Sequence, residues 1–468
     1  MLRSKVCVVL NDAKRVTMSR KALNAGVISI GSLVLSQGIR FAGNIFLAKL
    51  LAPSAFGVVA IVNMTILGVN LFSDLGLRQL IIQKKESLTA EYLNTLWVIQ
   101  IFRGLGVFCI ALACAALLFL LQMFGVVTAN AFADPLLPFL IAGASTSAVF
   151  NGLESTKSHT EYRSLNLGLV ASKEVVAQVI SLVVMILVAK ATSSPWALVL
   201  GAVVAALVRA SFSHVFLPGQ TNKLHFDKQV ARMVWTTGRW IAIASPLTFI
   251  ELNGPVILLG VLLSPTALGL FTIASLMAGV VHLLSQNLAA NVFLPSLSSA
   301  ARSTPPTLVQ TYARFQLIAD ALIVTAAGVL IAAGPAVVKV LFDARYAESG
   351  ALLSSLGIGL VALRYSVIEQ LCNAQGDFRL GPPTILCRIA AMFIGVYVGF
   401  HIDGVQGAAL GIGLSWFAGW PILVWYRSKT IGTPWRVESV AAAFLVFGYV
   451  IGLAVTQTVN HFQLHWHN

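Results

Sequence analysis

The chain has 468 residues, of which 57% are hydrophobic and 10% are charged, with 31 Lys and Arg against 17 Asp and Glu for a formal net charge of +14. About a quarter of the residues of an ordinary soluble domain are charged. This chain has too few charged residues to cover the outer faces of soluble domains. The composition therefore excludes a soluble globular protein and indicates a polytopic membrane protein.

The first 23 residues form a basic segment that carries six Lys and Arg residues. Its apolar run, VCVVL, is too short for the core of a secretory signal. We expect residues 1–23 to be a basic cytoplasmic tail without a cleavable signal, and Met18 is an alternative start.

Thirteen apolar segments follow this tail, and a bilayer is crossed by about 20 helical residues. Short connections marked by Pro or Gly join their outer ends. We therefore predict an all-α polytopic membrane protein with about 13 transmembrane helices. The predicted spans cover residues 24–51, 54–77, 90–123, 134–154, 165–190, 195–217, 238–263, 267–298, 312–342, 348–374, 380–401, 404–427 and 437–459.

The positions of the basic residues predict the orientation of these spans. With the N-terminus inside, the inner loops and tail hold 21 of the 31 Lys and Arg, and only Lys49, Lys190 and Arg345 fall outside. Basic residues are retained on the cytoplasmic side, so we predict a cytoplasmic N-terminus and, after 13 crossings, a periplasmic C-terminus. The net charge then reflects a cytoplasmic face on anionic lipid, and no nucleic-acid partner is expected.

A helix–turn–helix corner occurs twice in the sequence, as LAKLLAPSAFGVVAI between spans 1 and 2 and as LGVLLSPTALGLFTI between spans 7 and 8. Seven of the fifteen positions are identical, and a constant offset of 212 residues pairs Pro53 with Pro265 and Gly57 with Gly269. An even number of crossings separates the copies, so both point the same way, as in a parallel repeat. We predict two six-helix lobes around a central cavity, plus one extra C-terminal helix.

This repeat predicts five parts of the chain. In order, they are the tail at 1–23, an N-lobe with spans 1–6 at 24–217, a cytoplasmic linker at 218–237, a C-lobe with spans 7–12 at 238–427, and the thirteenth span with an outer tail at 428–468.

Charged residues inside the spans are the candidates for function, because a charge near the bilayer centre is costly unless it faces water or a partner. Arg40, Arg103 and Arg364 suit a substrate with phosphate or carboxylate groups, since a planar guanidinium binds two oxygens at once. Gln37 and Asn44 share a helix face with Arg40. We interpret these five residues as candidate substrate-binding residues in a hydrated cavity.

The same charges also fit a structural role, in which they pair with one another and hold the bundle together. This alternative applies equally to three acidic residues within spans, Glu251, Asp320 and Glu369. Polar residues spaced four apart, such as His282 with Gln286, favour the cavity. Three basic residues lie near span ends and are expected to snorkel to the interface: Lys339, Arg388 and Arg209.

Nothing in the sequence indicates a cofactor. Four of the five cysteines lie in or beside apolar spans, and their spacing predicts neither a disulfide framework nor a metal site. The outer tail HFQLHWHN contains histidines and is expected to be solvated. The predicted outer loops run to about ten residues and hold no catalytic cluster, so we do not expect an enzyme.

Four stretches taken in order resemble a known family. They are LAKLLAPSAFGVVAI, SDLGLRQLIIQKK, SPWALVLGAVV and LLGVLLSPTALGLFTIASL. Together they resemble the polysaccharide transporter (Wzx-type flippase) branch of the multidrug/oligosaccharidyl-lipid/polysaccharide exporters, over about residues 20–430. The chain departs from the family in span 7, where relatives often carry a polar or acidic residue closer to the corner than Glu251.

The resemblance implies a flippase of the bacterial inner membrane that moves an undecaprenyl-pyrophosphate-linked oligosaccharide to the periplasmic leaflet. It also implies coupling to an ion gradient, for which Glu251, Asp320 and Glu369 are the candidates. Membrane lipid and glycan polymerase or assembly proteins are the other implied partners. The alternative is a multidrug or small-solute antiporter of the same superfamily, although such a protein is expected to have an acidic, aromatic cavity.

Overall fold

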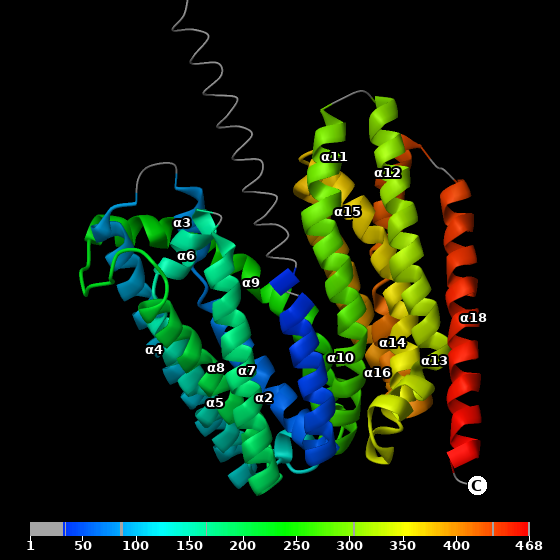
Figure 1. The fold of residues 1–468 in the computed structure, drawn as a ribbon, viewed down its shortest axis with the longest axis horizontal. Coiled ribbons are helices and arrows are strands. Elements are labelled where there is room, and N and C mark those ends of the chain that lie inside the picture. Colours follow the sequence, from blue (N-terminus) through cyan, green and yellow to red (C-terminus); the bar gives the residue numbers. More distant parts are fainter. Residues whose placement is uncertain are drawn as a thin grey trace, which may run out of the picture. The chain divides into compact units, whose positions relative to one another are not determined.

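The computed structural model describes residues 31–32, 34–84, 88–164, 166–302, 305–432 and 435–466, and every regular element in this part of the chain is a helix (Figure 1). The described residues divide into two compact units. Unit 1 holds the residues up to Leu51 together with Val62–Val126 and Pro135–Pro246. Unit 2 holds Ala52–Ile61, Val127–Asp134 and the residues from Leu247 onward.

Unit 1 is built from antiparallel apolar helices with short polar connections. Its closest packing joins α4 to α5, where Gly104 and Gly152 face each other and leave no room for a side chain on either. Its helical elements are residues 34–50, the second half of α2 (Pro53–Phe72), α3 (Leu77–Gln83), α4 (Ala90–Met123), α5 (Leu137–Leu153), α6 (Lys157–Arg163), α7 (Leu167–Thr192), α8 (Trp196–Val215) and the first half of α9 (Lys228–Leu262).

Unit 2 contains the remaining helices. The last of them, α18, packs along α13, where Gly448 contacts the backbone of Thr325 and Gly452 that of Val329. Its longer elements after α9 are α10 (Pro265–Leu288), α11 (Leu294–Ala301), α12 (Pro305–Ala319), α13 (Thr325–Leu341), α14 (Ser349–Leu360), α15 (Ser366–Ala374), α16 (Gly381–Ser415), α17 (Trp420–Ile431) and α18 (Trp435–Trp466).

Ten helices in the described part of the chain are long and apolar enough to cross a membrane. One of them, Gly381–Ile431, is two spans, because the backbone leaves helical geometry at Asp403 and Gly404 and folds back so that Gly399 contacts Gly407. With the shorter apolar helix α5 and the helical residues 34–50, these helices correspond in order to the thirteen predicted spans. The predicted all-α polytopic fold is thus confirmed.

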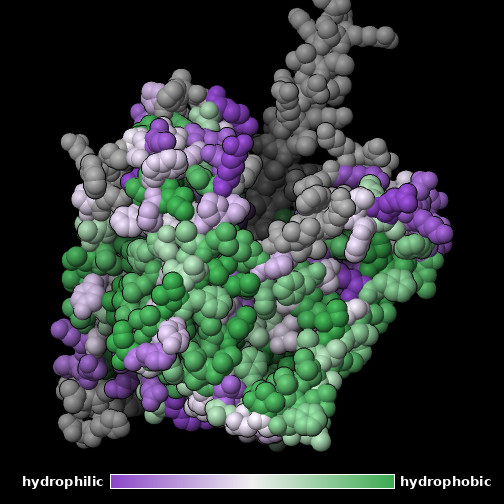
Figure 2. All heavy atoms as spheres, turned by 180° about the vertical axis from the view of Figure 1, so that it is seen from behind, coloured by the Kyte–Doolittle hydropathy of each residue, from purple (hydrophilic) through white to green (hydrophobic). Residues whose placement is uncertain are grey.

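Apolar side chains are exposed along the helices of both units, and hydrophilic ones gather near helix ends (Figure 2). Phe102 and Leu117 on α4 and Ile394 and Ile402 on α16 are all exposed. Such exposure would be unfavourable in water, and it is the expected condition of helices that face lipid. The protein is a multi-pass membrane protein.

The two copies of the repeated corner pack against each other within unit 2. A Cβ atom added to Gly57 would collide with the carbonyl oxygen of Pro265, and one added to Gly269 would collide with that of Pro53. The contact is reciprocal, as it is across a two-fold axis. Proline begins each helix, at a position where its missing N–H is not needed. The predicted close approach at Gly57 and Gly269 is confirmed.

Three neighbouring spans of unit 2 each contain a turn that is not α-helical. The π-turn η2 (Ala289–Phe293) separates α10 from α11, the π-turn η3 (Asp320–Val324) separates α12 from α13, and the 3-10 turn η5 (Val361–Tyr365) separates α14 from α15. Turn η3 contacts η5, and η2 contacts α15. Each turn changes the direction of the side chains that follow it, which decides what faces the cavity described next.

Candidate functional site

Unit 2 contains a cavity of about 710 Å³. Its walls come from α9, α10, η2, α11, α14, η5, α15, the 3-10 turn η6 (Phe378–Leu380) and α16, with Trp416 and Leu423 beyond the end of α16. This volume lies within the range of ligand-binding cavities, about 300–1,000 Å³. The polar pair predicted at His282 with Gln286 lines it, and so do Glu369 and Asn373, which are also four residues apart.

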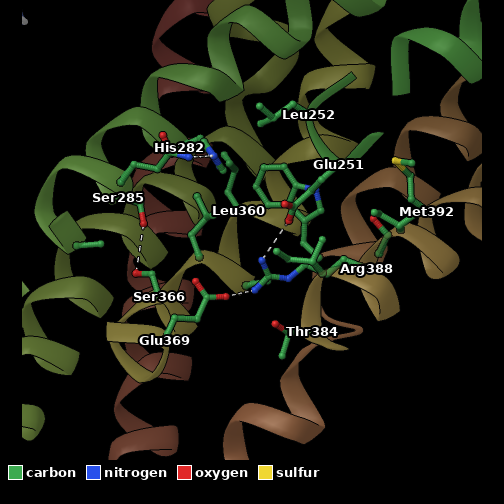
Figure 3. A pocket seen from close by; sticks show the side chains of 18 of the residues that line it. Glu251, Leu252, His282, Ser285, Leu360, Ser366, Glu369, Thr384, Arg388 and Met392 are labelled. Atoms are coloured by element: carbon green, nitrogen blue, oxygen red, sulfur yellow. Dashed lines mark hydrogen bonds and ion pairs between the residues drawn. The ribbon is translucent and has the colours of Figure 1, made fainter. Parts of the chain in front are cut away.

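Arg388 on α16 is the charged centre of this cavity, and it bridges two carboxylates (Figure 3). One arm donates to Glu369 on α15, and Nη1 lies 3.5 Å from Oε1 of Glu251 on α9. Because Gly419 has no side chain, the guanidinium has room beside the turn that follows α16, where an added Cβ would lie 3.3 Å from Nε. The expectation that Arg388 snorkels to the interface was wrong, because two carboxylates hold it in the cavity.

A second polar group lies on the α10 side of the cavity. Figure 3 shows His282 on this side. Its ring accepts a hydrogen bond at Nε2 from Nε2 of Gln286 at 2.8 Å, and it packs edge-on against Trp416 with ring centroids 5.0 Å apart. Among the described residues that line the cavity, two buried nitrogens have no hydrogen-bond partner, Nδ1 of His282 and Nε of Arg388. The wall therefore keeps hydrogen-bonding capacity that its own residues leave unused.

The charge of the cavity wall is negative. Glu251, Glu369 and Asp377 line it, and Arg388 is the only Lys or Arg among its described lining residues. The sequence identified Glu251 and Glu369 as candidates but missed their partner, because Arg388 lies close to the end of its predicted span. Asp320, the third predicted carboxylate, is not a lining residue.

Arg364 and Asp320 instead form a buried ion pair. Arg364 donates from Nε to Oδ1 at 2.7 Å and from Nη2 to Oδ2 at 2.9 Å. Gln316 supports the pair by donating to Asp320 at 3.2 Å and to the carbonyl oxygen of Arg364 at 3.3 Å. Arg364 is 2% exposed and Asp320 is fully buried. Arg364 therefore does not face a hydrated cavity as interpreted from the sequence, and the pair fits the alternative in which charges within spans pair with one another.

The remaining predicted residues lie in unit 1 and differ in environment. Arg40 is exposed on the helix of residues 34–50, with Gln37 and Asn44 partly buried on the same helix, and no ion pair of Arg40 is found among the described residues. Arg103 on α4 is partly buried, and its Nη1 lies 3.3 Å from Oδ1 of Asp74. Arg40 is thus the most exposed of the three predicted arginines.

A charged network that sequence reasoning did not find lies beside the end of α5. Lys173 on α7 donates to Glu154, and its Nζ lies 3.2 Å from Oε1 of Glu174. Ser158 donates a further hydrogen bond to Oε1 of Glu154 at 2.7 Å. These residues are scattered over two helices and a loop, so no local motif marks them.

His159 lies next to this network. Burial lowers the pKa of His159 to about 4; Glu154 opposes the shift, and the positive charges of Lys173, Arg78 and Arg103 add to it. Because the ring is neutral near pH 7, it brings no further charge into the network.

Comparison with known proteins identifies relatives for this architecture. A family model described as polysaccharide biosynthesis protein matches residues 46–351. No curated protein matches the sequence. These findings confirm the resemblance predicted from the four sequence stretches.

Solved structures share the fold at low sequence identity. One is the lipid II flippase MurJ in an inward closed conformation, with a TM-score of 0.69 and 14% identity over 92% of this chain and 92% of that chain. Another is a multidrug resistance MATE family transporter of the MOP superfamily in an inward-facing conformation, with a TM-score of 0.64 and 15% identity over 89% of this chain and 98% of that one.

Proposed function

This chain belongs to the polysaccharide biosynthesis protein family, and from that premise we propose that it is a flippase for an undecaprenyl-pyrophosphate-linked oligosaccharide. The cargo moves from the cytoplasmic to the periplasmic leaflet of the bacterial inner membrane for exopolysaccharide or lipopolysaccharide synthesis. The family match over residues 46–351 is the observation that carries the proposal, and the fold shared with a lipid II flippase supports it. Glycan polymerase or assembly proteins would then be partners.

The proposed mechanism is alternating access with the lipid tail left in the bilayer. A pyrophosphate carries about two negative charges, and an unpaired ion in a low-dielectric space is costly. Arg40 is the residue we assign to this group, because it is exposed and its guanidinium can hold two oxygens. Gln37 and Asn44 on the same helix would add hydrogen bonds, and Arg103 would contribute only by giving up part of its contact with Asp74.

The three-residue cluster of Glu251, Glu369 and Arg388 is the proposed coupling site. The single positive charge of Arg388 is paired with the two negative charges of Glu251 and Glu369. The cluster therefore has a net charge of −1 when all three residues are ionised. A proton or a monovalent cation bound by one carboxylate neutralises that excess and leaves Arg388 to the other. Because the carboxylates lie on α9 and α15 and Arg388 on α16, such a change of partner would shift these helices relative to one another.

The proposal is tested with purified protein in proteoliposomes that contain a lipid-linked oligosaccharide. Transport is measured as the fraction of oligosaccharide that a membrane-impermeant glycosidase can reach over time. Wild-type protein should raise the rate above that of protein-free vesicles, Arg40→Ala should return it to that level, and Arg40→Lys should recover part of it. Lys190→Ala, at the exposed end of α7, is the matched control.

Two results would contradict the proposal. Wild-type protein that leaves the rate of protein-free vesicles unchanged would exclude the flippase activity. Arg40→Ala protein with the wild-type rate would leave the activity intact but remove Arg40 from the substrate-binding residues.

A second candidate function is a multidrug or small-solute antiporter, and the acidic cavity with Trp416 in its wall favours it. Such a site suits an organic cation, because the aromatic ring and the carboxylates both attract positive charge. The two functions separate in the same vesicles. Uptake of a cationic dye driven by a pH gradient, without movement of the oligosaccharide, would favour the antiporter.

A further inference from the structure

We propose that the cavity of unit 2 is a subsite for a sugar ring of the cargo, and that it selects rings without negative charge. This inference rests on the proposed flippase function and adds the chemical class of saccharide that the protein accepts. Neutral hexoses, N-acetylhexosamines and amino sugars fit this class, whereas hexuronic acids and other acidic sugars do not.

The charge of the wall excludes the pyrophosphate from this cavity. Its only described Lys or Arg, Arg388, already uses both terminal nitrogens on Glu369 and Glu251. A phosphate placed here would meet three carboxylates and no free guanidinium. Like charges at close range in a poorly solvated space repel strongly. The anionic part of the cargo therefore has to be held outside this cavity.

The other lining residues match the surface of a sugar. A hexose ring has an apolar face of C–H groups and a rim of hydroxyls that both donate and accept hydrogen bonds. Trp416 offers an indole ring as an apolar platform. Carboxamides, which also donate and accept, line the cavity at Gln286, Gln370 and Asn373.

The unpaired nitrogens complete this match. Nε of Arg388 is a permanent donor, and Nδ1 of His282 is a donor as well, because Nε2 of the same ring accepts from the amide nitrogen of Gln286. Both lie on residues that line the cavity, and a buried polar atom without a partner is costly. A hydroxyl-rich ligand, by itself or through a bridging water, satisfies them without adding charge, which an anionic or purely apolar ligand does not.

Selectivity follows from the same charges. A carboxylate on the sugar would add a fourth negative group to the wall, and specificity by repulsion of the wrong ligand is a common device. Asp377 is the residue that can be neutralised to test this, because it lines the cavity without contacting Arg388. The two glutamates cannot serve, because neutralising either would also disturb the Arg388 cluster.

The test measures affinities of the full-length protein in nanodiscs for three lipids by native mass spectrometry. The lipids are undecaprenyl pyrophosphate, the same lipid with one N-acetylhexosamine, and the same lipid with one hexuronic acid. Wild-type protein should bind the N-acetylhexosamine lipid about tenfold more tightly than either of the others, a difference typical of a few additional contacts.

Trp416→Leu should remove that gain in affinity and leave the affinity for undecaprenyl pyrophosphate unchanged. The control variant Trp425→Leu, which replaces an exposed tryptophan on α17, should change neither affinity. Asp377→Asn should raise the affinity for the hexuronic acid lipid alone.

Each opposite result has a distinct meaning. Equal wild-type affinity for undecaprenyl pyrophosphate and its N-acetylhexosamine derivative would overturn the subsite while the flippase proposal stands. Equal loss of both affinities in Trp416→Leu would show that the ring supports the fold, and would also overturn the subsite. Wild-type preference for the hexuronic acid lipid would overturn the selectivity. Binding of none of the lipids would overturn the flippase proposal, and the subsite with it.

Discussion

The guanidinium of Arg364 and the carboxylate of Asp320 form a two-pronged ion pair in the core of unit 2, at distances of 2.7 and 2.9 Å. The partners lie on the non-α turns η5 and η3, which contact each other. The pair therefore joins two spans at the level where both helices change geometry. A buried pair of this kind is costly to break from one side, because the remaining charge is left without a partner.

Removal of one partner of this pair should destabilise the protein more than removal of both. Arg364→Met or Asp320→Leu alone should each lower the free energy of unfolding by about 3–5 kcal/mol, because a buried charge is left without its partner. The double variant should recover much of that loss. The measurement is a double-mutant cycle on the unfolding temperature of purified protein in detergent. A stable Arg364→Met protein that has lost only its transport would return Arg364 to the candidate substrate-binding residues.

The contact between the two corners should be sensitive to a single methyl group. Gly57→Ala or Gly269→Ala places a Cβ against the proline carbonyl oxygen of the other corner, so the helices must separate. Both variants should reduce the yield of folded protein, measured by fluorescence-detected size-exclusion chromatography, with little change in transport per folded molecule. Gly106→Ala on α4 is the matched control, because nothing lies within 4 Å of its added Cβ. Normal folded yield from both corner variants would show that the corner tolerates separation.

Acidification should destabilise the protein through His159. Its pKa is about 4 in the folded protein against an ordinary value of 6.5, so between these values the unfolded chain binds more protons and the free energy of unfolding falls as the pH falls. Because one pKa unit corresponds to about 1.4 kcal/mol, about 2 kcal/mol should be lost between pH 7 and pH 5.

This effect is measured as the difference in unfolding temperature between pH 7 and pH 5. His159→Gln should show a smaller drop than wild type, since glutamine does not titrate. His225→Gln, at an exposed position between α8 and α9, should keep the wild-type drop. An unchanged drop in His159→Gln would assign the pH dependence to other groups.

The orientation inferred from the basic residues predicts the result of reporter fusions. Fusions after Gln310 and Lys429 should show cytoplasmic activity, and a fusion after Asn468 should show periplasmic activity, because Lys and Arg are retained on the inner side. A cytoplasmic signal at Asn468 would contradict the predicted thirteen crossings.

The sequence by itself determined the elements of this protein and their order. Apolar length predicts each span, because the bilayer sets about 20 residues for one crossing. The duplicated corner predicted the close approach at Gly57 and Gly269, because proline and glycine act on the backbone at the position where they stand. These signals are local, so a single chain is enough to identify them.

Only the tertiary structure decided which charged side chains meet in the cavity. Arg364 and Arg388 are the same residue type in neighbouring spans, yet Arg364 is buried on Asp320 and Arg388 lies in the cavity with Glu251 and Glu369. Successive residues of an α-helix are about 100° apart around its axis, so a π-turn or a 3-10 turn changes the face on which every later side chain lies. Turns η3 and η5 contact each other although they are about 40 residues apart in the chain. Contacts of this kind cannot be seen in the spacing of residues along one span.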